Sequence, residues 1–162
     1  MSKAVYPGSF DPITLGHIDI IQRISRQFDE VVVLVSESSE KKYLFSAAER
    51  KAFIEKALPQ IKNMKVEVHQ GLTVDYCKKN NAQVIVRGLR AVVDFEYEMT
   101  MASMNKKLDA KIETMLVFAS PESYFISSRG VKEVASFGGD LSGLVPSEVA
   151  LVLMRKLQQQ KS

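Results

Sequence analysis

The chain has 162 residues, of which 46% are hydrophobic and 25% charged, so it is typical of one globular domain over residues 1–162 rather than of a disordered protein. Its net charge of +3 suits an anionic small-molecule ligand, without the dense basic patches of a nucleic-acid-binding protein. The single cysteine, Cys77, excludes an intrachain disulfide and a cysteine metal cluster. With no signal-peptide pattern and no run of about 20 apolar residues, we expect a cytoplasmic protein that does not enter the membrane.

The first predicted elements enclose a loop that contains two glycines and two prolines. Residues 3–6 are typical of a short buried strand, and the apolar residues of 18–28 recur at near-helical spacing. Thr14 stands where a helix N-cap is expected, and Gly16 would let a ligand approach the backbone. His17, on the first helical turn, would donate a hydrogen bond to a phosphate as a neutral or a protonated imidazole. A purely structural turn with a capping histidine is the alternative.

The rest of the chain alternates between strand and helix patterns. The apolar run Val31–Val35 is typical of a strand buried on both faces of a parallel sheet, and Ser46 with Glu49 predicts a capping box for a helix that ends near Leu58. Further strands are predicted at 65–68, 83–86 and 113–118, and further helices at about 74–79, 93–108, 127–137 and 146–157. This alternation predicts an α/β fold with a doubly wound five-stranded parallel sheet and right-handed crossovers. The tail 158–162 is expected to fray.

Two lysines follow the second predicted strand. Lys41 and Lys42 lie in the polar loop 36–42, on the sheet edge that also carries His17 if the strands are parallel. A lysine at this edge can act as a mobile charge on a transferred phosphoryl group. A pair of solvated loop lysines is the simpler interpretation, and the residues alone favour it.

Two arginines follow the fourth predicted strand. Arg87 and Arg90 offer fork-shaped donors beside the approachable backbone of Gly88, which suits phosphate recognition. The alternative is a turn whose arginines reach surface carboxylates, but the position at a strand exit favours a ligand site. The acidic residues of 94–98 also fit exposed helix positions or charges that complement the helix dipole.

A hydroxyl-rich segment, residues 123–129, precedes the fifth predicted helix. Ser127 is a good N-cap, which is a role that serine has in very many helices. Hydroxyls and amides at a helix N-terminus can also receive the β- and γ-phosphates of a nucleotide. The segment is therefore a candidate for holding a leaving pyrophosphate.

Several of these segments together resemble a known superfamily. Residues 8–12, Gly-Ser-Phe-Asp-Pro, followed by Thr-Leu-Gly-His at 14–17, resemble the nucleotide-binding entrance of the nucleotidyltransferases. The motif is often written His-x-Gly-His, and threonine in the first place is usual in the bacterial phosphopantetheine adenylyltransferase family. Residues 87–99 and the Ile-Ser-Ser of 126–128 continue the resemblance to that family in order and at its spacing.

The resemblance implies a Rossmann-like nucleotidyltransferase fold and a reaction. ATP would react reversibly with 4'-phosphopantetheine to give dephospho-coenzyme A and pyrophosphate, the penultimate step of coenzyme A synthesis, by in-line attack without a covalent enzyme intermediate. Mg²⁺ would arrive with ATP, keep mostly water and phosphate ligands, and take few or no protein ligands. A dedicated protein metal site is not expected, because His17 is the only other histidine that could partner His69. The family assembles as a homohexamer. The alternatives are another phosphorylated acceptor, or a non-catalytic nucleotide sensor on the same fold.

The resemblance also implies roles for individual residues. The catalytic residues would be His17, Lys41 and Arg90, facing the pentacoordinate phosphorus. The residues in contact with phosphopantetheine would be Ser9, Lys41, Thr73 and Arg87, with Lys42 replacing Lys41 if the register shifts by one residue. The residues in contact with ATP would be Ser9, Phe10, His17, Gly88, Leu89, Arg90, Glu98, Ser123, Tyr124, Phe125, Ile126, Ser127, Ser128 and Arg129. Family members commonly carry Ser or Thr where Arg129 stands, and a bulky aliphatic residue where Gly130 stands.

Overall fold

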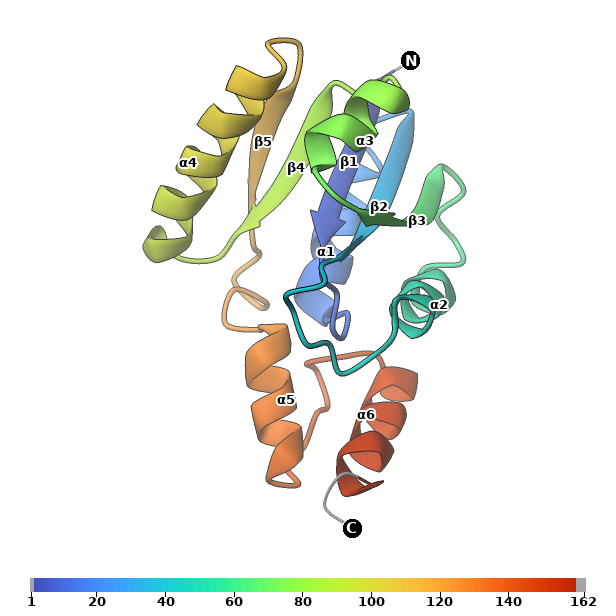
Figure 1. Cartoon of the computed structure of the whole chain (residues 1–162). Coiled ribbons are helices and arrows are strands. Elements are labelled where there is room, and N and C mark those ends of the chain that lie inside the picture. Colours follow the sequence, from blue (N-terminus) through green and yellow to red (C-terminus); the bar gives the residue numbers. More distant parts are fainter. Residues whose placement is uncertain (1, 160–162) are drawn as a thin grey trace.

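The computed structural model describes residues 2–159, in which strands and helices alternate as the sequence predicts (Figure 1). The strands are β1 (Lys3–Gly8), β2 (Glu30–Glu37), β3 (Met64–Gln70), β4 (Val84–Leu89) and β5 (Glu113–Phe118). The helices are α1 (Leu15–Ile24), α2 (Ala47–Ala57), α3 (Thr73–Lys79), α4 (Val92–Leu108), α5 (Ser128–Ser136) and α6 (Ser147–Gln159). Within this part of the chain, none of the helices is both long and apolar enough to cross a membrane.

The fourth strand is longer than predicted. It runs through Arg87–Leu89 instead of ending at Val86, because these residues pair with Leu116–Phe118 of β5. Charge and glycine make this stretch look like a loop in the sequence, but pairing with the neighbouring strand overrides that local preference. The backbone of Arg87 and Gly88 is therefore held in a sheet.

Two helix ends also differ from the prediction. α1 ends at Ile24, and Phe28, which extends the apolar periodicity, packs against the core from beyond the helix. α6 runs to Gln159, two residues beyond the predicted end at 157, and residues 160–162 lie outside the described residues. The periodicity thus identified core contacts correctly but placed one helix end too late.

All five strands are parallel, in the order β3-β2-β1-β4-β5. β1 pairs with β2 along its whole length, whereas on its other side it pairs through Ala4, opposite Val84, and Val5, opposite Ile85. Beyond Val5 the strands β1 and β4 separate. The strand order reverses at this same place, and in open α/β sheets ligands bind in the crevice at such a point.

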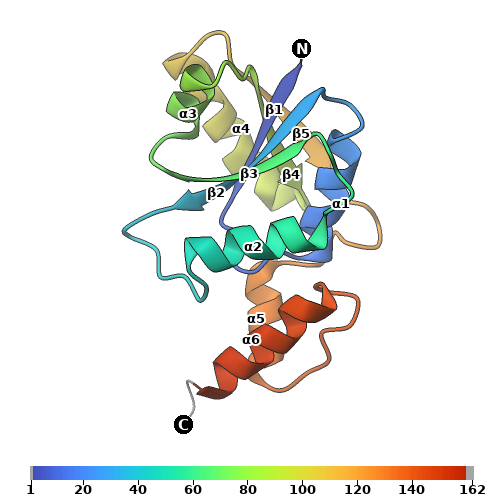
Figure 2. The same ribbon diagram turned by 90° about the vertical axis from the view of Figure 1, so that its right-hand side faces the viewer.

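Helices cover both faces of the sheet, as Figure 2 shows. One core, under α1 and α2, contains Ala4, Tyr6, Ile20, Ile21, Ile24, Val31, Val33, Phe53 and Ile54. The other core, under α3, contains Val5, Val32, Leu34, Val74, Cys77 and Ile85. Alternate residues of one strand thus face opposite cores, which explains the uninterrupted apolar runs of β1 and β2. The predicted doubly wound sheet is confirmed.

The last two helices, α5 and α6, lie beyond the carboxyl ends of the strands (Figure 1). α5 contacts the loop between β1 and α1, whose residues 9–14 we call the entrance loop, and the segment between α5 and α6 contacts the start of α1. The Ser128 hydroxyl donates to the Pro12 carbonyl at 2.7 Å, and the Leu15 N–H donates to the Leu144 carbonyl at 2.9 Å. The end of the molecule that carries the strand exits is therefore built from segments far apart in the sequence.

Candidate active site

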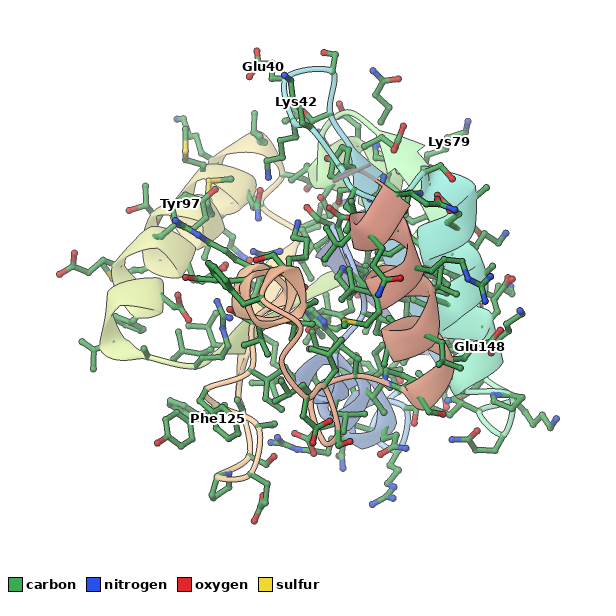
Figure 3. All side chains as sticks on the ribbon, turned by 90° about the horizontal axis from the view of Figure 1, so that it is seen from below. Glu40, Lys42, Lys79, Tyr97, Phe125 and Glu148 are labelled. Carbon is green, nitrogen blue, oxygen red and sulfur yellow. The ribbon has the colours of Figure 1, made fainter. Side chains whose placement is uncertain are left out.

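A cavity of about 320 Å³ lies where β1 and β4 separate, at the end of the molecule that Figure 3 views. Its lining comes from β1, the entrance loop, α1, β4, α4 and the segment before α5. The predicted contact residues that line it are Ser9, Phe10, His17, Arg87, Gly88, Arg90, Glu98, Ser123, Ile126, Ser127, Ser128 and Arg129. The structure thus brings together most of the residues that the sequence singled out.

Thr14 and His17 form a capping box at the start of α1. The Thr14 hydroxyl accepts from the His17 N–H at 3.4 Å, and the Nδ1 atom of His17 accepts from the Thr14 N–H at 3.1 Å. The Thr14 hydroxyl also lies 3.0 Å from Nδ1. Because a backbone N–H can only donate, Nδ1 is the unprotonated nitrogen of the neutral ring, and Nε2 carries the hydrogen. The box therefore fixes both the ring orientation and the tautomer of His17.

The environment of His17 keeps the ring neutral. Burial, followed by the charges of Arg90 and Arg87, lowers the pKa of His17 from 6.5 to about 4. Of the two states considered from the sequence, the structure therefore selects the neutral imidazole. At neutral pH the ring is a hydrogen-bond donor through Nε2 rather than an acid that supplies a proton.

Arg87 and Glu98 form a two-pronged ion pair in the wall of the cavity. The Arg87 Nε and Nη2 atoms donate to the two Glu98 carboxylate oxygens at 2.8 and 2.7 Å, and Nη1 donates to the Pro7 carbonyl at 2.9 Å. Burial acts to lower the pKa of Arg87, but the hydrogen bonds and charge of Glu98 outweigh it and raise that pKa. The arginine side chain thus joins β4 to β1 where their backbones have separated.

Arg90 lies at the mouth of the cavity and is paired more loosely. Its Nε atom is 3.4 Å from the Asp94 carboxylate, one turn away in α4, and its backbone N–H donates to the same carboxylate at 3.3 Å. The side chain is 42% exposed. Arg90 is therefore the more available of the two arginines for an anionic ligand. Its contact with Asp94 agrees with the alternative of an arginine that reaches a surface carboxylate, although Arg90 also lines the cavity.

The segment before α5 and the first turn of α5 both contribute to the lining of the cavity. The Ser127 hydroxyl caps α5 by accepting from the Gly130 N–H at 3.0 Å, so the N-cap interpretation is confirmed. A Cβ at Gly130 would lie 3.1 Å from that hydroxyl oxygen, so a larger residue here would require a small shift of the Ser127 side chain. Arg129 is exposed and lines the cavity, whereas Tyr124 and Phe125 are exposed outside the lining (Figure 3 labels Phe125).

The entrance loop packs the Phe10 ring against the His17 ring. Phe10 has a left-handed backbone with φ of 48°, and its ring lies edge-on to the His17 ring at 5.0 Å. A Cβ at Gly8 would come within 2.9 Å of the Phe10 ring, so a glycine is needed there for this packing. Gly16 lines the cavity, and a Cβ there would also lie 3.4 Å from the Ser123 carbonyl oxygen. It leaves room for the chain as well as for a ligand.

Three further predicted residues lie outside the lining. Lys41 is exposed in the loop after β2, and Figure 3 shows its neighbour Lys42 at the rim of this end of the molecule. Thr73 begins α3, with Leu72 at the N-cap position, and Leu89 is buried in β4. The roles implied for Lys41, Thr73 and Leu89 stay predictions.

Sequence reasoning missed a buried arginine. Arg50, in α2, is fully buried and donates to the Ser9 carbonyl of the entrance loop at 2.7 Å. A signal was present, since Phe53 and Ile54 lie three and four residues further on and share its helix face. A charged residue on the buried face of a helix indicates a specific set of partners.

These features match a known class of protein in sequence and in fold. The sequence profile of the cytidylyltransferase-like family matches residues 5–134. A nicotinic acid mononucleotide adenylyltransferase from Plasmodium falciparum, solved with NaAD, superposes with a TM-score of 0.69 at 16% identity, over 99% of this chain and 96% of that one. The parallel sheet and the crevice at its switch point are thus those of a Rossmann-like nucleotidyltransferase.

Full-length relatives narrow the class to one family. A phosphopantetheine adenylyltransferase from Bdellovibrio bacteriovorus is 66% identical over 98% of this chain and 100% of its own length. The enzyme of the same name from Clostridium kluyveri is 53% identical over 98% of this chain and 97% of its own length. The chain belongs to the phosphopantetheine adenylyltransferase family.

Proposed function

We propose that the chain transfers the adenylyl group of ATP to 4'-phosphopantetheine, giving dephospho-coenzyme A and pyrophosphate. The observation that carries this proposal is the 66% identity, over nearly the full length of both chains, to a relative that bears the enzyme's name. The crevice supports it, because a neutral imidazole, two arginines and the capped start of a helix converge on one cavity. Groups of these kinds bind and stabilise phosphates.

The chemistry needs little from the protein beyond position and charge. A phosphate monoester dianion can attack the α-phosphorus in line, so no side chain has to act as the nucleophile. Catalysis then consists of aligning the two substrates and stabilising the charge that develops on the α-phosphate. Because the pKa of His17 is about 4, the ring is neutral near pH 7, and it would donate a hydrogen bond from Nε2 to a phosphate oxygen without acting as an acid.

The two arginines would divide the phosphate contacts. Arg90 is 42% exposed and would turn its guanidinium from Asp94 to the α-phosphate. Arg87 keeps N–H groups beyond its bonds to Glu98 and Pro7, and these can reach the phosphopantetheine. Ser9, beside them, would orient the attacking phosphate.

The start of α5 would receive the leaving pyrophosphate. Ser127, Ser128 and Arg129 line the cavity there, and the first amides of a helix favour anions. Lys41 would reach the phosphates only if its exposed loop, residues 38–42, folds over the mouth of the cavity. We therefore propose Lys41 as a contact made on substrate binding.

Mg²⁺ would be held mainly by the phosphates of ATP and by water, where it offsets phosphate charge. The carboxylates in the cavity lining, Asp94 and Glu98, are each paired with an arginine, which fits a metal with few protein ligands. Among residues 2–159 no group of three or more His, Cys, Asp and Glu side chains is arranged to hold a metal.

We also propose that the protein is a cytoplasmic homo-oligomer, a homohexamer by its resemblance to the family. Support comes from α4, where Met99, Met104 and Leu108 are all at least half exposed and line one open, mostly apolar hollow of the helix surface. An apolar stripe of this kind on a soluble chain usually marks a protein contact. Sedimentation of the purified chain tests the size of the assembly.

The experiment for the proposed function is pyrophosphate release from ATP and Mg²⁺, with and without phosphopantetheine, and with CTP in place of ATP. We expect release that requires phosphopantetheine and prefers ATP. Turnover only with another phosphorylated acceptor would keep the nucleotidyltransferase class and overturn the substrate. ATP binding without release for any acceptor would favour a nucleotide sensor.

A further inference from the structure

Arg50 is a charged side chain enclosed by protein, with its guanidinium fully buried. Its Nη1 atom donates to the carbonyls of Ser9 at 2.7 Å and Ser36 at 3.0 Å, and its Nε atom donates to the Phe45 carbonyl at 3.1 Å. Its Nη2 atom forms an ion pair with the Glu37 carboxylate. One side chain thus binds the entrance loop, the end of β2 and the start of α2.

This arrangement is costly as a device for stability alone. Removing a guanidinium from water carries a large desolvation penalty, and an apolar side chain of the same size would often stabilise a core equally well. A buried charge with several backbone partners does fix those partners relative to one another. The Tyr43 ring, 4.1 Å from the guanidinium carbon, closes the remaining side.

The bond to Ser9 orients a peptide group beside His17. The Ser9–Phe10 peptide is trans, so the Phe10 N–H points opposite to the Ser9 carbonyl and away from Arg50. Phe10 has φ of 48°, a left-handed backbone that a non-glycine residue keeps only where its surroundings enforce it. Arg50 therefore fixes the orientation of a peptide whose two residues both line the cavity.

The same contacts set the ends of the loop that carries Lys41. Ser36 and Glu37, which Arg50 binds, lie just before this loop. At its other end, the N–H groups of Leu44 and Phe45 each donate to the buried Asp11 carboxylate at 2.9 Å. The loop of residues 38–43 is thus fixed at both ends to the entrance loop, by Arg50 and Asp11.

We propose that Arg50 is a positioning residue for adenylyl transfer. It aligns the Ser9–Phe10 peptide and the base of the Lys41 loop with His17, so that the two substrates meet in line. This inference rests on the proposed function, because it concerns the geometry of that reaction.

The test compares Arg50→Lys and Arg50→Met with variants of Ile54, which is fully buried one turn along the same helix face and makes none of these polar contacts. From Ile54→Val and Ile54→Ala, the variant that matches each Arg50 variant in unfolding midpoint serves as its control. Pyrophosphate release is measured well below every midpoint, with KM obtained for each substrate. Hydrogen exchange of residues 9–11 and 44–45 is measured on the same samples.

We expect Arg50→Met to lower kcat by up to about 100-fold with little change in the KM for ATP. Arg50→Lys should recover part of this loss, because its ammonium can reach some of the carbonyls but not all of them. Exchange should rise at both loop segments in the Arg50 variants and not in the matched Ile54 variants. Equal kcat losses at equal stability, or unchanged exchange, would reduce Arg50 to a structural residue. A wild-type chain without phosphopantetheine-dependent release would instead contradict the proposed function, and the exchange data would still decide whether Arg50 fixes the loops.

Discussion

The loops that leave β1 and β2 start from neighbouring strands but are built in opposite ways. In the entrance loop, Phe10, Asp11, Ile13 and Thr14 are all buried, and side chains of α1, α2 and α5 bind its backbone. In the loop after β2, Lys41 and Lys42 are exposed, and the Lys41 N–H donates only to the nearby Ser38 carbonyl. The difference suggests a division of labour. Groups that stabilise a transition state must be fixed before the substrate arrives, whereas a residue that captures a phosphate can close on it.

Among the rigid parts of the cavity wall, the Arg87–Glu98 ion pair is the one whose loss should lower stability most. Glu98→Ala leaves Arg87 in the cavity wall without its carboxylate, and because the Arg87 side chain is 32% exposed we expect a loss of about 1.5–3 kcal/mol of unfolding free energy. Urea unfolding of the variant measures this loss. Glu96→Ala, an exposed position on the same helix, is the control and should change stability by less than about 0.5 kcal/mol. A similar small loss at Glu98 would contradict the view that the pair holds the wall.

His17→Ala tests the preorganised donor. We expect kcat to fall by about 10²–10³-fold, which corresponds to about 2.7–4 kcal/mol of transition-state stabilisation, while ATP affinity changes little. Pyrophosphate release and calorimetric titration with ATP separate the two quantities. If ATP binding disappeared while turnover of the bound complex stayed normal, His17 would be a binding residue only.

Lys41→Ala tests the loop after β2, which we expect to close on a bound phosphate. Loss of a charge-assisted bond to phosphate should lower kcat/KM for phosphopantetheine by about 10- to 100-fold, without lowering stability, because the side chain is exposed in the free protein. Lys42→Ala is the matched control in the same loop and should have little effect. The reverse ranking would mean that Lys42 makes the contact, and two silent variants would remove this loop from the mechanism.

The smallest effect expected is that of mild acid on His17. Its pKa of about 4 keeps the ring neutral down to pH values well below the ordinary histidine range. The unfolded chain takes up a proton near pH 6.5, so this residue lowers stability as pH falls from 6.5 towards 4 and has no such effect above 6.5. Ring nitrogen NMR should find Nδ1 unprotonated throughout neutral pH. A ring that titrates near 6.5 would contradict the effect of burial and of the two arginines on the pKa, and a protonated Nδ1 in the neutral ring would show that Thr14 does not fix the tautomer.

The sequence predicts best what local pattern and strand burial determine. The Ser46–Glu49 capping box, the apolar runs of β1 and β2 and the N-cap at Ser127 are each visible within a few residues and are confirmed. The convergence of the entrance loop with β4 and α5 also follows from parallel strands, whose carboxyl ends lie at one edge.

Features that depend on distant partners were not predictable in this way. Arg50 is buried because its carbonyl partners, among them Ser9, come from distant turns of the chain. The Thr14 N-cap and the capping histidine, which the sequence offered as an alternative, are confirmed, but their reciprocal box was not predicted because its last place usually carries Glu or Gln. The mutual pairing of Arg87 and Glu98, each assigned to a different ligand, depends on how α4 lies against β4.

The short pairing of β1 with β4 also affects how the molecule would come apart. Pro7 has no N–H to donate to a backbone ladder with β4. At this residue the two strands are joined by the Arg87 side chain, which donates to the Pro7 carbonyl. Partial unfolding follows lines where few backbone bonds must break. Opening between β1 and β4, along the crevice, should therefore break fewer backbone bonds than opening between β1 and β2. A ligand held by both sides of the crevice would suppress opening along that seam.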